Sequence, residues 1–492
     1  MKLWSLKVCA IMVFALALCP AHAARKAGDI EVEKGMAKAA DGSTVPYEIG
    51  TIYLPENRAN PNSRLIGVGF ARIKARQPSN APPVFWLPGG PGLAVLDAFD
   101  GSSEAARNRL RSWLTFGAVG DLVVVEQRGN TLRGDMLRQT ARAVPLDRPF
   151  TDAQRREAAI QLARDAVASN PDKDLAGYTI RDCADDVDAV RRALGYSKIT
   201  LFGGSFGSQW SFAVMRAHPD IVARAVLAGV EPLDLGYDMP SQLLAAMKRI
   251  AADADRDPGL APYLPPGGIM AAANAVRERL AKAPVEVSVD GQRVVLGLED
   301  FQSALQDEAG DPENWPAFVL SLYHGHYEGW ARNEISGRQA APQKLIGPLA
   351  DTSLGVTPQR AAQLRADPAL PLLGSAGFEP YMAAAEVWPT PDMGDSFRSM
   401  SRIGIPVLLI HGDWDSSTPV ENTLAQLRYL PNGKAIIVHR GGHDGAFYLL
   451  REAPQVKESV YRFLKTGEMK DLPGELTLPV PAFVKPAFAP KS

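Results

Sequence analysis

The sequence predicts an α/β protein with one mostly parallel central sheet that has helices on both faces. Three observations support this fold class. Short apolar runs alternate with helix-length segments through the first half of the chain, this alternation stops near Leu235, and it resumes after about Arg402. Such alternation is typical of parallel strands joined by helical crossovers. A chain of 492 residues is long enough to form a large buried core.

The individual elements follow from local patterns. Apolar or alternating runs predict strands at residues 47–54, 65–75, 83–87, 121–125, 198–202, 224–230, 406–411 and 434–439. Helices are expected at 151–168, 179–195, 206–218 and 455–464, and a hairpin at 285–296 around Asp290-Gly291. The first of these helices begins at Thr151, with Gln154 placed to complete a capping box.

The break in the alternation divides the chain into segments. We expect a signal peptide at 1–23, the two parts of a sheet domain at 24–235 and 403–466, an insertion at 236–402, and a Pro-rich tail at 467–492. The tail should be extended, either docked or mobile. Because the insertion separates two late strands, it should lie over the carboxyl ends of the strands, where open α/β sheets bind ligands. We therefore interpret it as a largely helical cap.

The first residues have the three parts of a secretory signal. Lys2 and Lys7 precede an apolar run at 8–19, and small residues follow up to Ala23. The run is too short to span a bilayer, and no later stretch reaches 18 apolar residues, so the mature chain should be exported, periplasmic or secreted, without a membrane span. An uncleaved anchor and a lipid anchor on Cys19 are the less favoured alternatives.

Cys183 is the one cysteine beyond the predicted signal, so no intramolecular disulfide is expected in the mature chain. A lone cysteine could be a nucleophile. However, apolar residues at helical spacing, including Ile180, Val187 and Val190, favour a place in the core.

The charge balance and the lack of several known motifs argue against several classes of function. There are 53 Lys+Arg against 55 Asp+Glu, a formal charge of −2, so no nucleic-acid partner is expected. The sequence has no P-loop and no dinucleotide fingerprint, which predicts no cofactor. His324 and His326 form an H-x-H pair without a third ligand at suitable spacing, so no metal site is predicted. The sequence gives no prediction of oligomeric state.

Residues 203–207, Gly-Gly-Ser-Phe-Gly, match the pattern G-x-S-x-G, with a predicted strand before them and a predicted helix after them. A sharp strand–turn–helix exposes the Ser205 hydroxyl at a helix N-terminus, where partial positive charge favours a developing anion. Ser205 is therefore our candidate nucleophile. The alternative is a glycine-rich turn capped by a serine.

A serine hydroxyl needs a base to take its proton, and the base needs an orienting carboxylate. The strand at 406–411 leads into Asp413 and Asp415, and the strand at 434–439 leads into a glycine pair and His443. His443 is the better candidate base, because His411 and His439 end strands and should be packed or locally hydrogen-bonded. The residues alone leave Asp413 and Asp415 open as the orienting acid.

An oxyanion pocket is expected at residues 88–92, Pro-Gly-Gly-Pro-Gly, directly after a strand. Glycine lets a tetrahedral intermediate approach backbone N–H groups. Pro91 has no N–H, so the predicted donors are the N–H of Gly90 and the N–H of Phe206, which follows the nucleophile.

Together these motifs resemble the α/β-hydrolase serine peptidases of the proline iminopeptidase and tripeptidyl aminopeptidase branch. Residues 88–92 resemble its oxyanion loop, with proline where many members have histidine, and residues 126–129, Glu-Gln-Arg-Gly, resemble its Asp-Gln-Arg-Gly signature except at Glu126. Residues 412–415 with Thr418-Pro419 resemble the loop of the triad aspartate, and residues 50–58 resemble the lead-in of exported members.

The resemblance implies an α/β-hydrolase fold and a triad of Ser205, His443 and Asp415, with Asp413 left as a turn-forming carboxylate. It implies an aminopeptidase that releases proline or short peptides from peptide N-termini. A cap carboxylate would then receive the free ammonium, and Glu231, Glu328 and Glu334 are candidates that the sequence does not separate. The alternatives are a carboxylesterase with the same triad and a catalytically silent binding protein.

Overall fold

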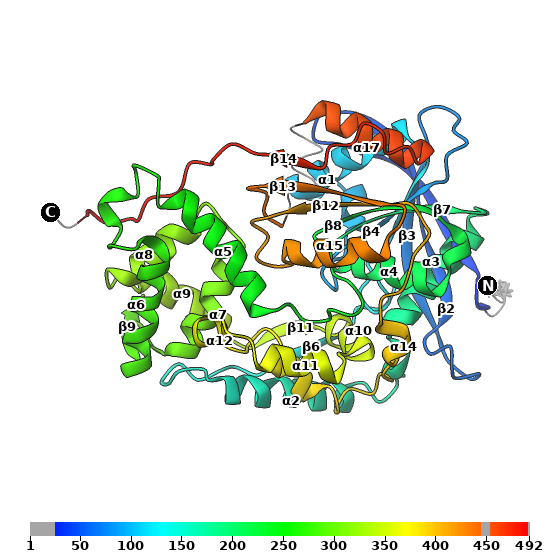
Figure 1. Cartoon of the computed structure of the whole chain (residues 1–492). Helices are drawn as coiled ribbons and strands as arrows, with labels where there is room; N and C mark the ends of the chain where they lie inside the picture. The colour runs from blue at the N-terminus through cyan, green and yellow to red at the C-terminus, as the bar shows by residue number, and fades with distance from the viewer. Residues whose placement is uncertain (1–24, 444–452, 491–492) are drawn as a thin grey trace, which may run out of the picture.

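The computed structural model describes residues 25–443 and 453–490, so the predicted signal at 1–23 lies outside the described residues. The described chain contains a sheet of ten strands (Figure 1). In sheet order they are β1 (Ile30–Lys38), β2 (Thr44–Pro55), β3 (Leu65–Ile73), β5 (Leu122–Val125), β4 (Val84–Leu87), β7 (Ile199–Gly204), β8 (Val222–Ala228), β12 (Val407–Gly412), β13 (Gly433–His439) and β14 (Glu475–Thr477). From β5 to β14 every neighbouring pair is parallel, whereas β1, β2 and β3 pair antiparallel.

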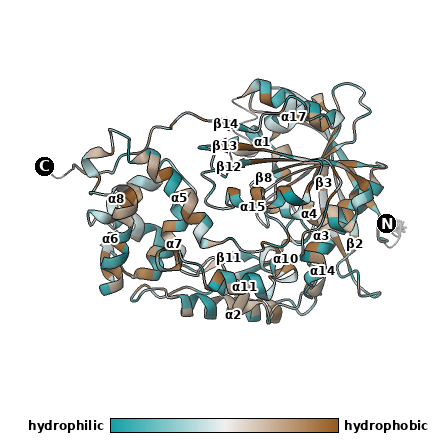
Figure 2. Ribbon diagram, viewed as in Figure 1, coloured by the Kyte–Doolittle hydropathy of each residue, from teal (hydrophilic) through white to brown (hydrophobic). Residues whose placement is uncertain are grey.

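Both faces of this sheet are buried under helices. Phe85 and Leu87 of β4 belong to the hydrophobic cluster under α3 (Ile180–Ala193) and α4 (Phe206–Ala217). The alternate residue Trp86 belongs to the cluster under α1 (Glu104–Leu114) and α17 (Pro454–Thr466). The central strands are accordingly brown in Figure 2, whereas the outer helices carry much teal. The predicted fold class, an α/β hydrolase with a mostly parallel sheet, is confirmed.

Most predicted elements are present within a few residues of their expected bounds. Helix α2 (Asp152–Ser169) has the predicted capping box of Thr151 and Gln154, and the hairpin forms from β9 (Val285–Val289) and β10 (Gln292–Leu296). Sequence patterns missed β1 because seven of its nine residues are exposed, so it has no apolar face to recognise.

The inserted residues contribute to two hydrophobic cores. Five helices form a core of their own: α5 (Pro240–Ala254), α6 (Gly268–Lys282), α7 (Leu298–Glu308), α8 (Trp315–Tyr323) and α9 (Glu328–Gly337). In contrast, α10 (Ile346–Leu354) packs into the cluster under α3 and α4. β11 (Ala341–Lys344) pairs with β6 (Arg138–Ala141), which precedes the insertion, and α13 (Glu379–Ala384) lies against α2. The insertion is therefore attached to the sheet domain along its second half.

The other short elements connect these parts. They are α11 (Pro358–Arg365), α12 (Leu370–Leu373), α14 (Asp395–Arg398), α15 (Val420–Gln426), η1 (Leu96–Phe99), η2 (Thr115–Ala118), η3 (Leu175–Gly177), η4 (Pro219–Ile221), η5 (Ala261–Tyr263) and η6 (Leu427–Tyr429). None of the helices described is both long and apolar enough to cross a membrane. Cys183 is fully buried on α3, in agreement with its predicted place in the core.

The C-terminal tail runs from the sheet to the helices of the insertion (Figure 1). Phe483 packs beside Trp414, with ring centroids 6.2 Å apart, and Phe488 stacks on His326 at 4.0 Å. The Tyr263 hydroxyl donates to the Phe488 carbonyl at 2.9 Å. Of the two predicted states of the tail, the docked one is therefore observed.

Candidate active site

The candidate site lies where the strand order reverses. β4 has β5 on one side and β7 on the other, so the loops that leave β4 and β7 diverge from adjacent carboxyl ends. Leu87 pairs with Gly203, and a Cβ built on Gly89 would lie 3.2 Å from Ser205 Cβ. The predicted oxyanion loop and the predicted nucleophile are therefore direct neighbours.

Ser205 occupies the sharp turn between β7 and α4. Its φ of 54° and ψ of −134° lie in a region that costs a non-glycine residue free energy. The surroundings hold this conformation: the Ser205 N–H donates to the Ala228 carbonyl at 2.9 Å. A Cβ on Gly207 would lie 2.2 Å from the Leu87 carbonyl oxygen, so only glycine permits this approach of helix to strand.

Asp415 is the carboxylate that holds His443. The distance from Asp415 Oδ2 to His443 Nδ1 is 2.9 Å, and the Asp415 side chain is 1% exposed. Thr418 donates its N–H to Oδ1 at 2.8 Å and its hydroxyl to Oδ2 at 2.7 Å. Burial alone would raise the Asp415 pKa, but hydrogen bonds from His411 and His443 outweigh it and hold the pKa well below its usual range. Asp415 is therefore ionised at neutral pH and fixes the imidazole.

The competing residues have other partners. Asp413 accepts the Arg440 N–H at 2.8 Å and lies 2.8 Å from His439 Nδ1, so it joins the loops after β12 and β13. His411 is fully buried, with the Thr418 carbonyl and the Thr423 hydroxyl each at 2.7 Å, and its Nε2 also lies 3.4 Å from Asp415 Oδ2. These contacts are structural ones.

Glu231 interacts with both the nucleophile and the histidine. Its Oε1 accepts the Ser205 hydroxyl at 3.4 Å, and it interacts electrostatically with His443. A Cβ on Gly229 would lie 3.1 Å from His443 Cε1, so glycine keeps space for the ring. Ser205, His443, Asp415 and Glu231 therefore converge at one edge of the sheet.

The surroundings of Glu231 make it a weak acid. Burial raises its pKa to about 8, with smaller contributions in the same direction from Asp238, Asp351 and Asp415 that exceed the opposing effect of His443. The carboxyl group is therefore mostly protonated at neutral pH. A cation placed beside it would favour its ionised form.

The structure distinguishes the three carboxylates that the sequence left open as receptors for a substrate ammonium. Glu328 is exposed on α9, and Glu334 accepts hydrogen bonds from Trp330 at 3.2 Å and from Arg338 at 3.2 Å. Only Glu231 contacts Ser205. Its position three residues after the end of β8, at the same sheet edge as the nucleophile, is the sequence signal that could have selected it.

The predicted oxyanion donors lie on two adjacent loops. Phe206 is the first residue of α4, where N–H groups have no partner within the helix. Gly90 has a φ of 114°, which a side chain would disfavour. Gln127 braces the loop, because its Oε1 accepts the Gly92 N–H at 2.5 Å and its Nε2 donates to the carbonyls of Pro88 and Gly89, each at 3.1 Å. Sequence reasoning missed this role of Gln127.

Glu126 is the position at which the sequence departs from the family signature, and backbone N–H groups hold its side chain. Its carboxylate accepts the N–H groups of Val95 at 2.6 Å, Leu96 at 2.9 Å and Leu132 at 2.7 Å. Burial outweighs these bonds and raises its pKa. Glu126 therefore fixes the segment that follows the oxyanion loop.

No metal centre appears in the part of the chain that the structure describes. His324 lies 2.9 Å from the Tyr263 carbonyl through Nε2, and His326 stacks on Phe488. Both rings take part in docking the tail.

Two family models match the chain. The model described as alpha/beta hydrolase fold matches residues 161–261, which include Ser205. The model described as TAP-like protein matches residues 371–475, which include Asp415 and His443.

Similar proteins share parts of the chain. Proline iminopeptidases from two strains of Xylella fastidiosa, 9a5c and Temecula1, are each 32% identical over 83 residues, which are 17% of this chain and 26% of the relative. The match thus spans about a quarter of each curated relative. A proline iminopeptidase structure from Mycobacterium smegmatis aligns over 84% of this chain and 97% of that chain, with 15% identity and a TM-score of 0.36. A thermophilic esterase from Thermogutta terrifontis covers 85% and 99%, with 16% identity and a TM-score of 0.35. The family models and the curated relatives confirm the resemblance to the proline iminopeptidase and TAP-like branch of α/β hydrolases.

Proposed function

We propose that this α/β hydrolase is an exported serine aminopeptidase that releases N-terminal residues from peptides. Ser205 is the nucleophile, His443 the general base and Asp415 the orienting acid. The N–H groups of Gly90 and Phe206 stabilise the oxyanion. Export is proposed from the signal pattern at residues 1–23.

In the proposed reaction, Ser205 Oγ attacks the scissile carbonyl carbon while His443 takes its proton. The tetrahedral oxyanion faces the two N–H groups. The C–N bond then breaks, and His443 gives the proton to the leaving amine. Water then attacks the acyl-enzyme while His443 takes its proton. The C–O bond to Ser205 breaks, His443 returns the proton to Ser205 Oγ, and the acid product leaves.

The observation that carries the peptidase assignment is the position of Glu231, 3.4 Å from Ser205 Oγ. When the first residue of a peptide acylates Ser205, the α-amine of that residue is two bonds from its own carbonyl carbon, which is now bound to Ser205 Oγ. This amine would lie within reach of the Glu231 carboxyl group. The carboxyl group would lose its proton to solvent and pair, as a carboxylate, with the ammonium. An ester without a cationic group has no use for a carboxylate at this place, which disfavours the carboxylesterase alternative.

The test compares alanine naphthylamide, its N-acetyl form and a short-chain nitrophenyl ester. We expect wild-type protein to cleave the free-amine amide at least tenfold faster, in kcat/KM, than the acetylated one. Glu231→Gln should remove most of this preference and leave ester cleavage within about twofold of wild type. High ester turnover without amide cleavage would contradict the peptidase proposal and favour the esterase.

A further inference from the structure

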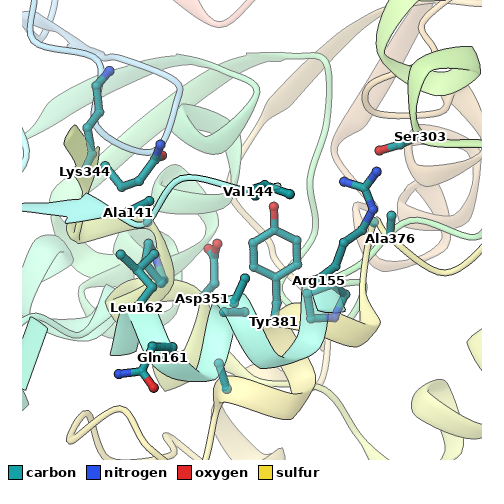
Figure 3. A pocket seen from close by; sticks show the side chains of 18 of the residues that line it. Ala141, Val144, Arg155, Gln161, Leu162, Ser303, Lys344, Asp351, Ala376 and Tyr381 are labelled. Atoms are coloured by element: carbon teal, nitrogen blue, oxygen red, sulfur yellow. The ribbon is translucent and has the colours of Figure 1, made fainter. Parts of the chain in front are cut away.

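A cavity of about 780 Å³ separates the sheet domain from the inserted helices over part of their boundary. Figure 3 shows side chains of both parts around it, Leu162 from α2 and Ser303 from α7 among them. The two parts do not pack together there, so contacts elsewhere along the boundary must hold the insertion in place. Arg440, which does not line the cavity, makes one set of these contacts.

Arg440 has a backbone conformation that glycine would adopt at a lower cost. Its φ is 63°, in the left-handed region that disfavours residues with a Cβ. Among the described residues, Ser205 and Asp290 are the other non-glycine residues with a positive φ. Ser205 is the candidate nucleophile, and Asp290 lies in the tight turn between β9 and β10. A strained conformation at Arg440, directly before two glycines, indicates that its side chain is needed at this place.

The side chain of Arg440 joins two other parts of the chain. Its Nε donates to Asp253 Oδ2 on α5 at 2.7 Å, and its Nη1 donates to the Leu478 carbonyl in the C-terminal tail at 2.9 Å. The side chains of Arg440 and Asp253 are 26% and 9% exposed, so water and salt screen this ion pair only in part. A planar guanidinium presents its donors in fixed directions, which lets one side chain hold both acceptors in place.

The backbone around Arg440 connects the two loops that carry the acid and the base of the proposed triad. The Arg440 N–H donates to Asp413 Oδ1 at 2.8 Å, and the Trp414 N–H donates to the Gly441 carbonyl at 2.9 Å. The acid loop has a tie of its own to α5, because the Asp413 carbonyl accepts Arg249 Nη1 at 3.0 Å. Loss of the Arg440 side chain should therefore free the base loop more than the acid loop.

We propose that Arg440 is a positioning residue for the general base: its side chain fastens the loop that carries His443 to α5 and to the C-terminal tail. The inference rests on the proposed function, in which His443 takes the proton of Ser205. The imidazole then keeps its productive place only while the loop keeps both attachments. A misplacement of about 1 Å can slow a reaction roughly a hundredfold, so an attachment away from the reacting atoms can matter for catalysis.

The experiment measures kcat and KM for alanine naphthylamide and a short-chain nitrophenyl ester in Arg440→Gly. Glycine adopts a φ of 63° without strain, so this variant removes the side chain, keeps the backbone conformation and should fold. We expect kcat to fall about tenfold or more while KM stays within about twofold, because proton transfer needs the base in place and substrate binding does not. Arg440→Lys keeps the charge but cannot hold both acceptors, so its kcat should lie between those of Arg440→Gly and wild type.

Chemical rescue separates positioning from a general loss of structure. Millimolar guanidinium ion should raise the kcat of Arg440→Gly about threefold or more and leave wild type unchanged, because the ion can bind between Asp253 and the Leu478 carbonyl. The matched control is Arg256→Gln. Arg256 donates to the other oxygen of the Asp253 carboxylate and does not touch the base loop, so kcat should stay within about twofold of wild type.

A double variant tests whether the attachment to α5 acts through Arg440. Asp253→Asn should lower kcat about threefold in the wild-type background and should have no further effect in Arg440→Gly, since residues that share one interaction are not additive. A kcat of folded Arg440→Gly within about twofold of wild type, or additive effects of the two changes, would overturn the inference and leave the proposed function intact. If folded wild-type protein turns over neither the amide nor the ester, the proposed function itself fails.

Discussion

Glu231 and Asp415 show how two carboxyl groups at one sheet edge acquire opposite properties. Asp415 receives donors from Thr418 and His443 and stays ionised. Burial, together with nearby like charges, raises the pKa of Glu231, which has one long hydrogen bond from Ser205 and so keeps its proton. Environment rather than residue type therefore assigns one carboxyl group to orient the base and leaves the other available for a cation.

The pH dependence of substrate choice follows from this difference. Glu231 has a pKa of about 8, and a peptide α-amine has a pKa of about 7.7–8.0. Binding of the ammonium needs the carboxylate, which is lost below that range, and the protonated amine, which is lost above it. The ratio of kcat/KM for free and acetylated alanine amide should therefore peak near pH 8.

A ratio is the appropriate measurement because the titration of His443 affects both substrates and cancels. The other titratable groups that interact with Glu231 are Asp238, Asp351 and Asp415. In Glu231→Gln the ratio should be flat on the acid side. A ratio in wild-type protein that stays constant from pH 6 to 9 would exclude Glu231 as the ammonium receptor.

The sequence allowed prediction of those site residues that have a fixed place relative to strand ends. Ser205, Asp415 and His443 each follow a recognisable apolar strand. Gln127 and Thr418 could not be predicted in their roles, because their partners are backbone and side-chain groups that only the tertiary fold brings near.

At the scale of elements, the segment 126–129 acts as a brace for the oxyanion loop. Gln127 holds the loop, and Arg128 anchors the segment to α3 through Asp186, with contacts of 2.8 and 2.7 Å. Arg128 is fully buried and also donates to the carbonyls of Glu56 and Gly177. Residues 126–129 thus support the site through the oxyanion loop and α3.

Replacement of Arg128 should therefore cost stability. In Arg128→Met the buried Asp186 carboxylate loses its bidentate partner and keeps the single bond from Arg58 at 2.5 Å. We therefore expect the free energy of unfolding to fall by about 3 kcal/mol in urea denaturation, the lower end of the cost of breaking a buried pair. The matched control is Arg181→Met on the same helix, whose exposed pair with Asp185 should contribute no more than about 0.5 kcal/mol. Equal stability of the two variants would refute a bracing role for Arg128.

At the scale of the whole molecule, the sheet and the inserted helices are joined in three ways. α10 packs into the core of the sheet domain, β11 pairs with β6, and the C-terminal tail docks on both parts. Continuous apolar runs predicted the central strands, because these strands are buried on both faces. The tail contacts could not be predicted in this way, because isolated aromatics such as Phe483 belong to no such run.

The docking of the tail is open to a direct test. Phe483 is 6% exposed and belongs to the hydrophobic core of the inserted helices, so Phe483→Ala should weaken docking by about 3 kcal/mol. Limited proteolysis within residues 478–490 should then be roughly 100-fold faster. Val480→Ala, at a side chain that is 48% exposed, is the control and should leave the cleavage rate unchanged.

The proposed chemistry depends most on Ser205 as a nucleophile that His443 activates, and covalent labelling measures this directly. A fluorophosphonate probe should modify the folded chain once, on the peptide that contains Ser205, and mass spectrometry should locate the adduct there. His443→Ala should slow the labelling by at least a hundredfold. Folded wild-type protein that stays unlabelled, or an adduct on any other residue, would contradict the assignment of this site.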